Sequence, residues 1–257
     1  MDEIVVTVAE HILRLEINRP AKKNALSAAM YAAMTQALER AANDPEIRAV
    51  VISGQPDAFT SGNDINDFMQ ALRGLRFEET EVFRFLEALR SAPKPLVAAV
   101  RGLAVGVGTT LLLHCDLVYA GASARFQLPF VNLGLVPEAA SSLLLPQVAG
   151  YRRAAELLLL GDMFDAQKAR DAGIVNAVVE DDAVLGAALA AAAALAQKPP
   201  VALRLAKALM KQGSGAATQQ RIREEGAYFV ERLASPEARE AFAAFLERRK
   251  PDFSRFA

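Results

Sequence analysis

Residues that bind transition metals or form disulfides are scarce in this sequence. Cysteine occurs once among the 257 residues, at Cys115, and histidine occurs twice, at His11 and His114. One thiol excludes an internal disulfide, and these three residues do not have the spacing of a zinc site. We therefore expect no metal site and assign any chemistry to carboxylates, hydroxyls and backbone amides.

Long apolar runs and an excess of one charge are also lacking. The chain is 53% hydrophobic but has no run of about 18 apolar residues, so we expect no membrane-spanning helix. Its 29 basic and 30 acidic residues form no block of like charge, so nucleic acid is not an expected partner. The ends MDEIVVTVAE and SRFA resemble neither a signal peptide nor a peroxisomal tripeptide, and we expect a cytoplasmic protein.

Apolar periodicity predicts an α/β core in the first part of the chain. Residues 4–8 and 12–17 alternate like the strands of a hairpin, and Ser27 is a natural N-cap for a helix that ends at 43–45. The other elements expected here are strands over 49–53, 93–100, 116–120, 126–128 and 176–179, a loop over 54–65, a helix over 68–89 interrupted near Gly74, a glycine-rich turn over 102–108 and a short helix over 109–115.

Beyond about Val179 the sequence predicts helices. The expected segments are 182–197, 199–212, 216–233 and 236–249, separated by glycine, serine and proline. The chain thus divides into an α/β core over 1–195 and a helical region over 196–257. The many leucine and alanine residues of the helical region indicate faces that pack between subunits.

Two loops of small residues are candidates for binding an anion or a carbonyl oxygen. The loop AFTSGND, 58–64, follows a strand, and its glycine allows close approach of the backbone to a ligand. The segment RGLAVGVGTTLLL, 101–113, turns into a helix whose first amides lack an intrahelical acceptor. Gly108 is followed by Thr-Thr, which argues against a nucleotide loop. Taken singly, the first is more often a surface loop, and the second is as often a packing contact.

Taken together, these loops and their neighbours resemble the crotonase (enoyl-CoA hydratase/isomerase) superfamily. The blocks that carry the resemblance are AFTSGNDI, AAVRGLAVGVGTTLLLHCDLVYAGASARFQLP and NLGLVPEAASSLLLPQVAGYRRAAELLLLGDMFDAQKARDAGIVNAVVE, with NRPAKKNALS before them and FLERRKPDF after them. They occur in the family's order and cover nearly the whole chain.

The resemblance implies a crotonase-like spiral of β-α-β units with a C-terminal helical trimerisation region. The implied assembly is a homotrimer or a dimer of trimers, and the implied substrate is an acyl-CoA thioester, with coenzyme A as part of the substrate and no separate cofactor. In this family the thioester oxygen lies between two backbone amides, and the matching positions here are Asn63 and Val107. Each well-placed amide lowers the barrier to enolate formation by roughly 3 kcal/mol.

The same resemblance implies further substrate contacts. Lys22 and Lys250 match positions that contact CoA phosphates, the second across a subunit boundary, although solvated lysines are common anywhere on a surface. Asp64 lies next to the Asn63 amide, but a residue that fixes its own loop is the favoured explanation of it. The substrate-binding set is completed by Ala58, Ser61, Gly62, Ile65, Gly106, Phe130 and Leu133, with Leu72 and Phe77 as further candidates for the acyl pocket.

Two positions depart from the hydratase pattern of the family. Hydratases use two glutamates to hold and activate water, and the matching residues here are Thr110 and Phe130. Neither is a base, and a phenylalanine displaces the water that hydration needs. Glu138, in GLVPEAASS, instead matches the catalytic glutamate of Δ3,Δ2-enoyl-CoA isomerases.

Glu138 has a structural and a catalytic explanation. An isolated glutamate after proline is typical of the first turn of a helix, where the macrodipole favours it. Within this family the position favours one base that moves a proton from C2 to C4 of the acyl chain. We therefore predict a Δ3,Δ2-enoyl-CoA isomerase. The alternatives are ring-opening or dienoyl isomerisation, thioester hydrolysis, or a noncatalytic acyl-CoA-binding subunit.

Overall fold

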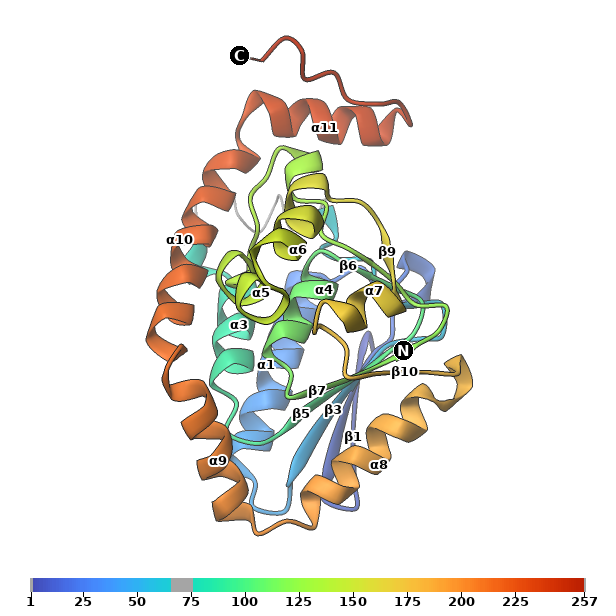
Figure 1. Ribbon diagram of the computed structural model, residues 1–257, viewed down its shortest axis with the longest axis vertical. Coiled ribbons are helices and arrows are strands. Elements are labelled where there is room, and N and C mark those ends of the chain that lie inside the picture. The colour runs from blue at the N-terminus through green and yellow to red at the C-terminus, as the bar shows by residue number, and fades with distance from the viewer. Residues whose placement is uncertain (1, 66–75, 257) are drawn as a thin grey trace.

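The structure is a computed structural model, which describes residues 2–65 and 76–256. Two β-sheets lie between layers of helices, and long helices follow them in the chain (Figure 1). The strands are β1 (Ile4–Ala9), β2 (Ile12–Ile17), β3 (Ala49–Ser53), β4 (Ala58–Thr60), β5 (Leu96–Val100), β6 (Leu103–Val105), β7 (Leu117–Gly121), β8 (Arg125–Gln127), β9 (Phe164–Asp165) and β10 (Ala177–Val179). The helices are α1 (Ala28–Asn43), α3 (Glu81–Ser91), α4 (Val107–Thr110), α5 (Ser141–Ala149), α6 (Tyr151–Ala155), α7 (Ala166–Asp171), α8 (Val184–Ala196), α9 (Pro200–Gln212), α10 (Gly215–Leu233) and α11 (Pro236–Leu246).

The larger sheet has the strand order β1-β2-β3-β5-β7-β10. The predicted hairpin is confirmed, because β1 and β2 pair antiparallel with Ala9 opposite Ile12, and the remaining pairs are parallel. Side chains alternate between its two faces. On one face the residues Ala49, Val51, Val97 and Ala99 pack against α8, while Val50 and Ile52 face the main core.

The smaller sheet has the order β4-β6-β8-β9, and along the chain its strands alternate with strands of the larger sheet. Strand β3 is followed by β4, β5 by β6 and β7 by β8, so each turn of the chain adds one strand to each sheet. The pairs β4-β6 and β6-β8 are parallel. This arrangement confirms the α/β core that the sequence predicts and gives the spiral that the family resemblance implies.

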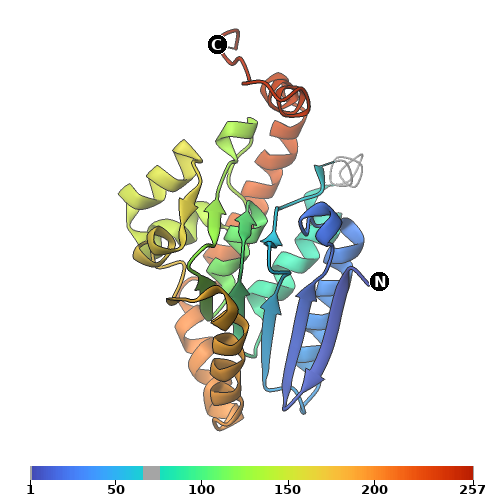
Figure 2. The same ribbon diagram turned by 90° about the vertical axis from the view of Figure 1, so that its right-hand side faces the viewer.

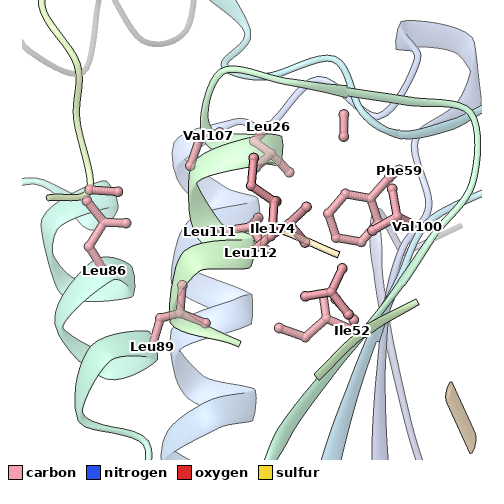
Figure 3. Close-up of a cluster of buried hydrophobic side chains, with 14 of the residues drawn as sticks. Leu26, Ile52, Phe59, Leu86, Leu89, Val100, Val107, Leu111, Leu112 and Ile174 are labelled. Atoms are coloured by element: carbon pink, nitrogen blue, oxygen red, sulfur yellow. The ribbon is translucent and has the colours of Figure 1, made fainter. Parts of the chain in front are cut away.

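The α4 segment passes through the centre of the main core. Figure 3 shows Val107 of α4, and Leu111 and Leu112 of the 3₁₀ turn that follows it, between α3 on one side and the strands on the other. Their surroundings include Leu26, Ile52, Phe59, Leu86, Leu89, Val100 and Ile174. The start of α4 is therefore fixed by packing on both sides.

The helices after β10 run across the lower end, up one long side and across the upper end of the molecule in Figure 1. Helix α8 covers the larger sheet, α10 runs along α3 and α5, and α11 lies with the C-terminal residues at one end (Figures 1 and 2). No single helix among the described residues is long and apolar enough to cross a membrane. The segments Asp181–Ala196 and Pro200–Gln212 meet that test only as a pair bent by 111°.

Several predicted boundaries are wrong. The loop over 54–65 contains β4, and the turn over 102–108 contains β6, because strands of three residues are too short to show a period. The segment 109–115 is the end of α4 followed by a 3₁₀ turn, Leu111–His114. The last helix ends at Leu246 rather than 249. Of the helix predicted over 68–89, residues 68–75 lie outside the described residues, and α3 confirms the part from Glu81.

Asn24 ties the first turn of the spiral to the second. Its buried amide group donates hydrogen bonds to the carbonyl oxygens of Ile17 at 3.0 Å, Ala58 at 2.7 Å and Phe59 at 3.2 Å. Its Oδ1 accepts from the N–H of Arg19 at 2.7 Å. Residue 24 has a φ of 58°, a conformation that asparagine adopts more easily than alanine.

Asn24→Ala is expected to lower the free energy of unfolding by roughly 3 kcal/mol, because it leaves buried backbone groups unpaired and adds strain at a positive φ. Urea unfolding followed by circular dichroism measures this. The control is Asn43→Ala, which removes an exposed side chain that donates only to Glu39 O at 2.9 Å and is expected to change stability by less than about 0.5 kcal/mol. An equal loss of unfolding free energy in Asn24→Ala and Asn43→Ala would contradict the proposed structural role of Asn24.

Candidate functional site

A mostly apolar pocket lies between the two glycine-containing loops and the C-terminal helices. Its volume is about 110 Å³. The residues that line it come from the loop after β4, the β6-α4 turn, the segment after β8, α10 and α11. They are Ser61, Gly62, Asn63, Ile65, Val105, Gly106, Val107, Pro129, Phe130, Leu133, Leu135, Phe229, Leu233 and Phe242. The structure thus brings together loops that lie far apart in the sequence.

Most of the predicted contact residues lie in this pocket. Those that line it are Ser61, Gly62, Asn63, Ile65, Gly106, Val107, Phe130 and Leu133. Of the two further candidates for the acyl pocket, Phe77 packs against Gly226 of α10 instead, and Leu72 lies outside the described residues. The pocket residues Phe229, Leu233 and Phe242 were not predicted, because their helices carry no motif that marks a ligand.

The backbone N–H of Asn63 points away from Leu26, the residue that pairs with this loop. Leu26 donates to Gly62 O at 2.8 Å and accepts from the N–H of Asp64 at 2.9 Å. In extended backbone, successive N–H groups point to opposite sides. The N–H of Asn63 therefore points away from Leu26, and Asn63 itself lines the pocket.

The amide of Val107 is the first of α4. Gly106 precedes it with a φ of 56° and a ψ of −119°, a conformation that favours glycine. The N–H groups of Thr109 and Thr110 both donate to Gly106 O, at 2.9 and 3.0 Å, while the first amide of a helix has no intrahelical acceptor. The backbone N–H groups of Asn63 and Val107 thus have no hydrogen-bond acceptor within their own segments, and both residues line the pocket.

Tyr31 is hydrogen-bonded to Asn63 of the pocket wall and is close enough to Glu138 to be affected by its charge. The Tyr31 hydroxyl on α1 donates to Asn63 Oδ1 at 2.5 Å, which fixes the side chain of that residue. Burial, and then the charge of Glu138, raise the pKa of Tyr31 well above its ordinary value. The sequence did not single out Tyr31, because it lies on the apolar face of a predicted helix.

Glu138 lies in a turn before α5, and its carboxylate is buried. Helix α5 begins at Ser141, so the first-turn explanation of Glu138 is wrong. The side chain is 7% exposed and accepts a hydrogen bond from the Thr110 hydroxyl on α4. Burial raises the pKa of Glu138 to about 8, against the Thr110 hydrogen bond, which lowers it, while Glu225 raises it further.

Thr110 ties Glu138 to the helix that begins at the pocket wall. Thr110 is three residues after Val107 in the same short helix, and Glu138 is not among the described residues that line the pocket. The carboxylate is thus one helical turn from the Val107 amide. Thr110, which matches a hydratase glutamate, holds the carboxylate of Glu138 instead.

Two side chains hold the turn that carries Glu138. His114 Nε2 lies 2.8 Å from Ala139 O, and burial lowers the pKa of His114 to about 4, so the neutral ring donates from Nε2. Glu225 on α10 accepts from the N–H groups of Ala140 at 2.6 Å and Ser142 at 2.9 Å. The structural interpretation of His114 is supported, whereas Glu225 was not predicted and carries no local sequence signal.

Phe130 fills the other hydratase position with an aromatic ring. Its side chain is 4% exposed and packs edge-on against Phe229 of α10, with 6.5 Å between the ring centres. Both rings line the pocket. The aromatic pair gives this part of the pocket an apolar surface.

The remaining predicted residues lie outside the pocket lining. Ala58 is buried in β4 and accepts from Asn24, and Asp64 Oδ2 accepts from Arg19 at 2.9 Å, which supports a structural role for Asp64. Lys22 and Lys250 are exposed. Within residues 2–65 and 76–256, no group of three or more His, Cys, Asp or Glu side chains is arranged to hold a metal ion.

Comparisons with known proteins agree with this geometry. Residues 7–255 match the family model described as enoyl-CoA hydratase/isomerase. The chain is 36% identical to the 2,3-dehydroadipyl-CoA hydratase of Escherichia coli (strain K12), over 98% of this chain and 99% of that protein. It is 34% identical to the 1,2-epoxyphenylacetyl-CoA isomerase of the same organism, over 99% of both chains.

A solved structure confirms the fold. The crystal structure of enoyl-CoA hydratase/isomerase from Pseudoalteromonas atlantica T6c matches with a TM-score of 0.92 and 44% identity, over 98% of this chain and 100% of that chain. The names of the relatives include a hydratase and an isomerase, so they do not select one reaction. The matched family, the spiral fold and the pocket agree, and the chain belongs to the enoyl-CoA hydratase/isomerase family.

Proposed function

We propose that this protein isomerises a 3-enoyl-CoA to the conjugated 2-enoyl-CoA. The observation that carries the proposal is the buried carboxylate of Glu138, whose pKa is raised to about 8, next to the helix that begins with the Val107 amide. A carboxylate with such a pKa both accepts and returns a proton near neutral pH. Membership of the family supports an acyl-CoA substrate.

The proposed reaction moves one proton and needs no other reactant. The thioester oxygen accepts hydrogen bonds from the N–H groups of Asn63 and Val107. The carboxylate of Glu138 removes a proton from C2, and the C–H electrons form the enolate, whose negative charge those amides stabilise. The enolate then re-forms the thioester carbonyl and takes the same proton at C4. The double bond has moved from C3–C4 to C2–C3, and Glu138 is ionised again.

Two features support isomerisation over hydration. Hydration requires a base that activates water, and the matching positions hold Thr110, which donates to Glu138, and the buried ring of Phe130. The described lining of the pocket carries no charged side chain, which favours an apolar acyl chain. One relative is named as an isomerase of 1,2-epoxyphenylacetyl-CoA, which has a different acyl group, and ring-opening isomerisation is the first alternative to test.

Further parts of the proposal concern CoA binding and assembly. Coenzyme A enters as part of the substrate, and the exposed Lys22 and Lys250 are proposed to contact its phosphates, the second from a neighbouring subunit. We propose an α/β catalytic core over 1–195, a helical region over 196–257 that joins subunits in a homotrimer or a dimer of trimers, and a cytoplasmic location.

Glu138→Gln is expected to lower the turnover of a 3-enoyl-CoA by a factor of about 10² or more, because the amide keeps the shape and loses the base. The absorbance of the conjugated thioester product measures this. The control Glu180→Gln changes an exposed glutamate and should retain native turnover.

Native turnover in Glu138→Gln would contradict the proposed base. If the native protein forms no conjugated product from several chain lengths of 3-enoyl-CoA, the isomerase proposal fails. Product analysis with 2-enoyl, dienoyl and epoxide acyl-CoA substrates then identifies the family reaction that it performs, or shows that it only binds acyl-CoA.

The pH dependence of kcat/KM is expected to follow the protonation of Glu138. Only the ionised carboxylate accepts the C2 proton, so kcat/KM should rise with pH and reach half its maximum near pH 8. Thr110→Val removes the hydrogen bond that lowers this pKa, so its midpoint should move to higher pH. A kcat/KM that is flat between about pH 6 and 9, or a midpoint that moves to lower pH in the variant, would contradict this assignment.

A further inference from the structure

The turn that carries Glu138 is unusual in its backbone conformation. Ala139 and Ala140 follow it directly with φ values of 58° and 59°. Two successive alanines in the left-handed region are costly because the Cβ atom crowds the following carbonyl oxygen. Such conformations persist only where the surrounding structure holds them.

Glu225 supplies an acceptor that the turn itself lacks. Ala140 precedes the first residue of α5, at the position where serine, threonine or aspartate normally caps a helix, and alanine has no acceptor in its side chain. The two oxygens of Glu225 take this role from α10, 85 residues away along the chain, by accepting from Ala140 N and Ser142 N. Glu225 is 5% exposed, so these bonds are shielded from water.

Neighbouring groups hold the same turn from other elements. Arg221, one turn before Glu225 on α10, donates to Ser142 Oγ at 2.9 Å. The neutral His114 ring donates to Ala139 O from the opposite end of the turn. Ser141 N donates to Glu138 O at 3.0 Å, which closes the turn behind the carboxylate.

We infer that Glu225 is a positioning residue that keeps the 138–142 turn in its strained conformation and so holds the Glu138 carboxylate against Thr110. This inference rests on the proposed role of Glu138 as the base. It places part of the catalytic machinery in the helical region after β10. Glu225 itself acts on the backbone of the turn and takes no part in the proton transfer.

The charge of Glu225 has a second, measurable effect. The side chains that shift the pKa of Glu138 are Thr110 from α4 and Glu225 from α10. Glu138 in turn raises the pKa of Tyr31 on α1, and Arg221 lowers the pKa of Glu225. Glu225 raises the pKa of Glu138, so removal of its charge should lower that pKa. A residue that only stabilised the fold would not shift the pH profile in this direction.

Glu225→Gln is expected to reduce kcat about tenfold or more with little change in KM, and to move the kcat/KM midpoint to lower pH by about half a unit or more. Glu225→Asp keeps the charge and shortens the reach, so kcat should fall while the midpoint moves to lower pH by less than in Glu225→Gln. The matched control is Glu231→Gln, which changes an exposed glutamate of the same helix α10. It should match the native protein.

Ala140→Gly tests the conformational part of the inference. Glycine adopts a φ near 59° without the cost that alanine incurs, so it needs less support from Glu225. In the Glu225→Gln background it should restore kcat at least severalfold relative to Glu225→Gln alone. Unchanged kcat in Glu225→Gln, or no rescue in a double variant that folds, would overturn the inference and leave the isomerase function standing.

A native protein without isomerase activity would instead overturn the proposed function, and a stability measurement then decides the inference separately. Because the folded pKa of Glu138 is raised, native stability relative to Glu138→Gln should fall as pH rises from about 4.5 to 8. The comparison of native Glu138 with Glu138→Gln is then repeated in the Glu225→Asp background, which keeps the charge at position 225 but weakens its hydrogen bonds to the turn. There Glu138 gains access to water, so the pH dependence of stability should weaken. An unchanged pH dependence would overturn the positioning role.

Discussion

The removal of one carboxylate from water is the constraint on which the rest of the site depends. Glu138 is buried, and its pKa is raised mainly by this burial. Burial of an ionisable group is costly unless hydrogen bonds compensate, and Thr110 supplies one such bond. The polar residues around the turn are arranged for this purpose: Tyr31 lies near the charge, and His114 and Glu225 bind the backbone that carries it.

The helical region is part of the site and does not simply follow the core. Helix α10 provides Glu225 to the turn and Phe229 and Leu233 to the pocket, and α11 provides Phe242. The elements that surround the site therefore come from both of the proposed regions, 1–195 and 196–257. A change in the packing of α10 against α3 and α5 alters the shape of the pocket and the support of the proposed base together.

Local patterns in the sequence were sufficient for most of the fold. The hairpin, the Ser27 cap of α1 and the long helices after β10 all have a period or a capping residue that a short window detects. Strands β4 and β6 have only three residues each and depend on partners in the smaller sheet. The loops around Asn63 and Val107 were found through the family resemblance, whereas Glu225 and Tyr31 act across 85 and 32 residues without any local signal.

The bond between Thr110 and Glu138 also constrains how this scaffold can change its chemistry. A glutamate at position 110, as the hydratases have, would set two buried carboxyl groups within hydrogen-bonding distance of each other. Such a pair shares one proton, because both cannot ionise at close range in a medium of low dielectric constant. A base at position 110 and the proposed base at position 138 are therefore alternatives. An evolutionary path between hydration and the proposed isomerisation has to exchange them together or pass through a protein that does neither well.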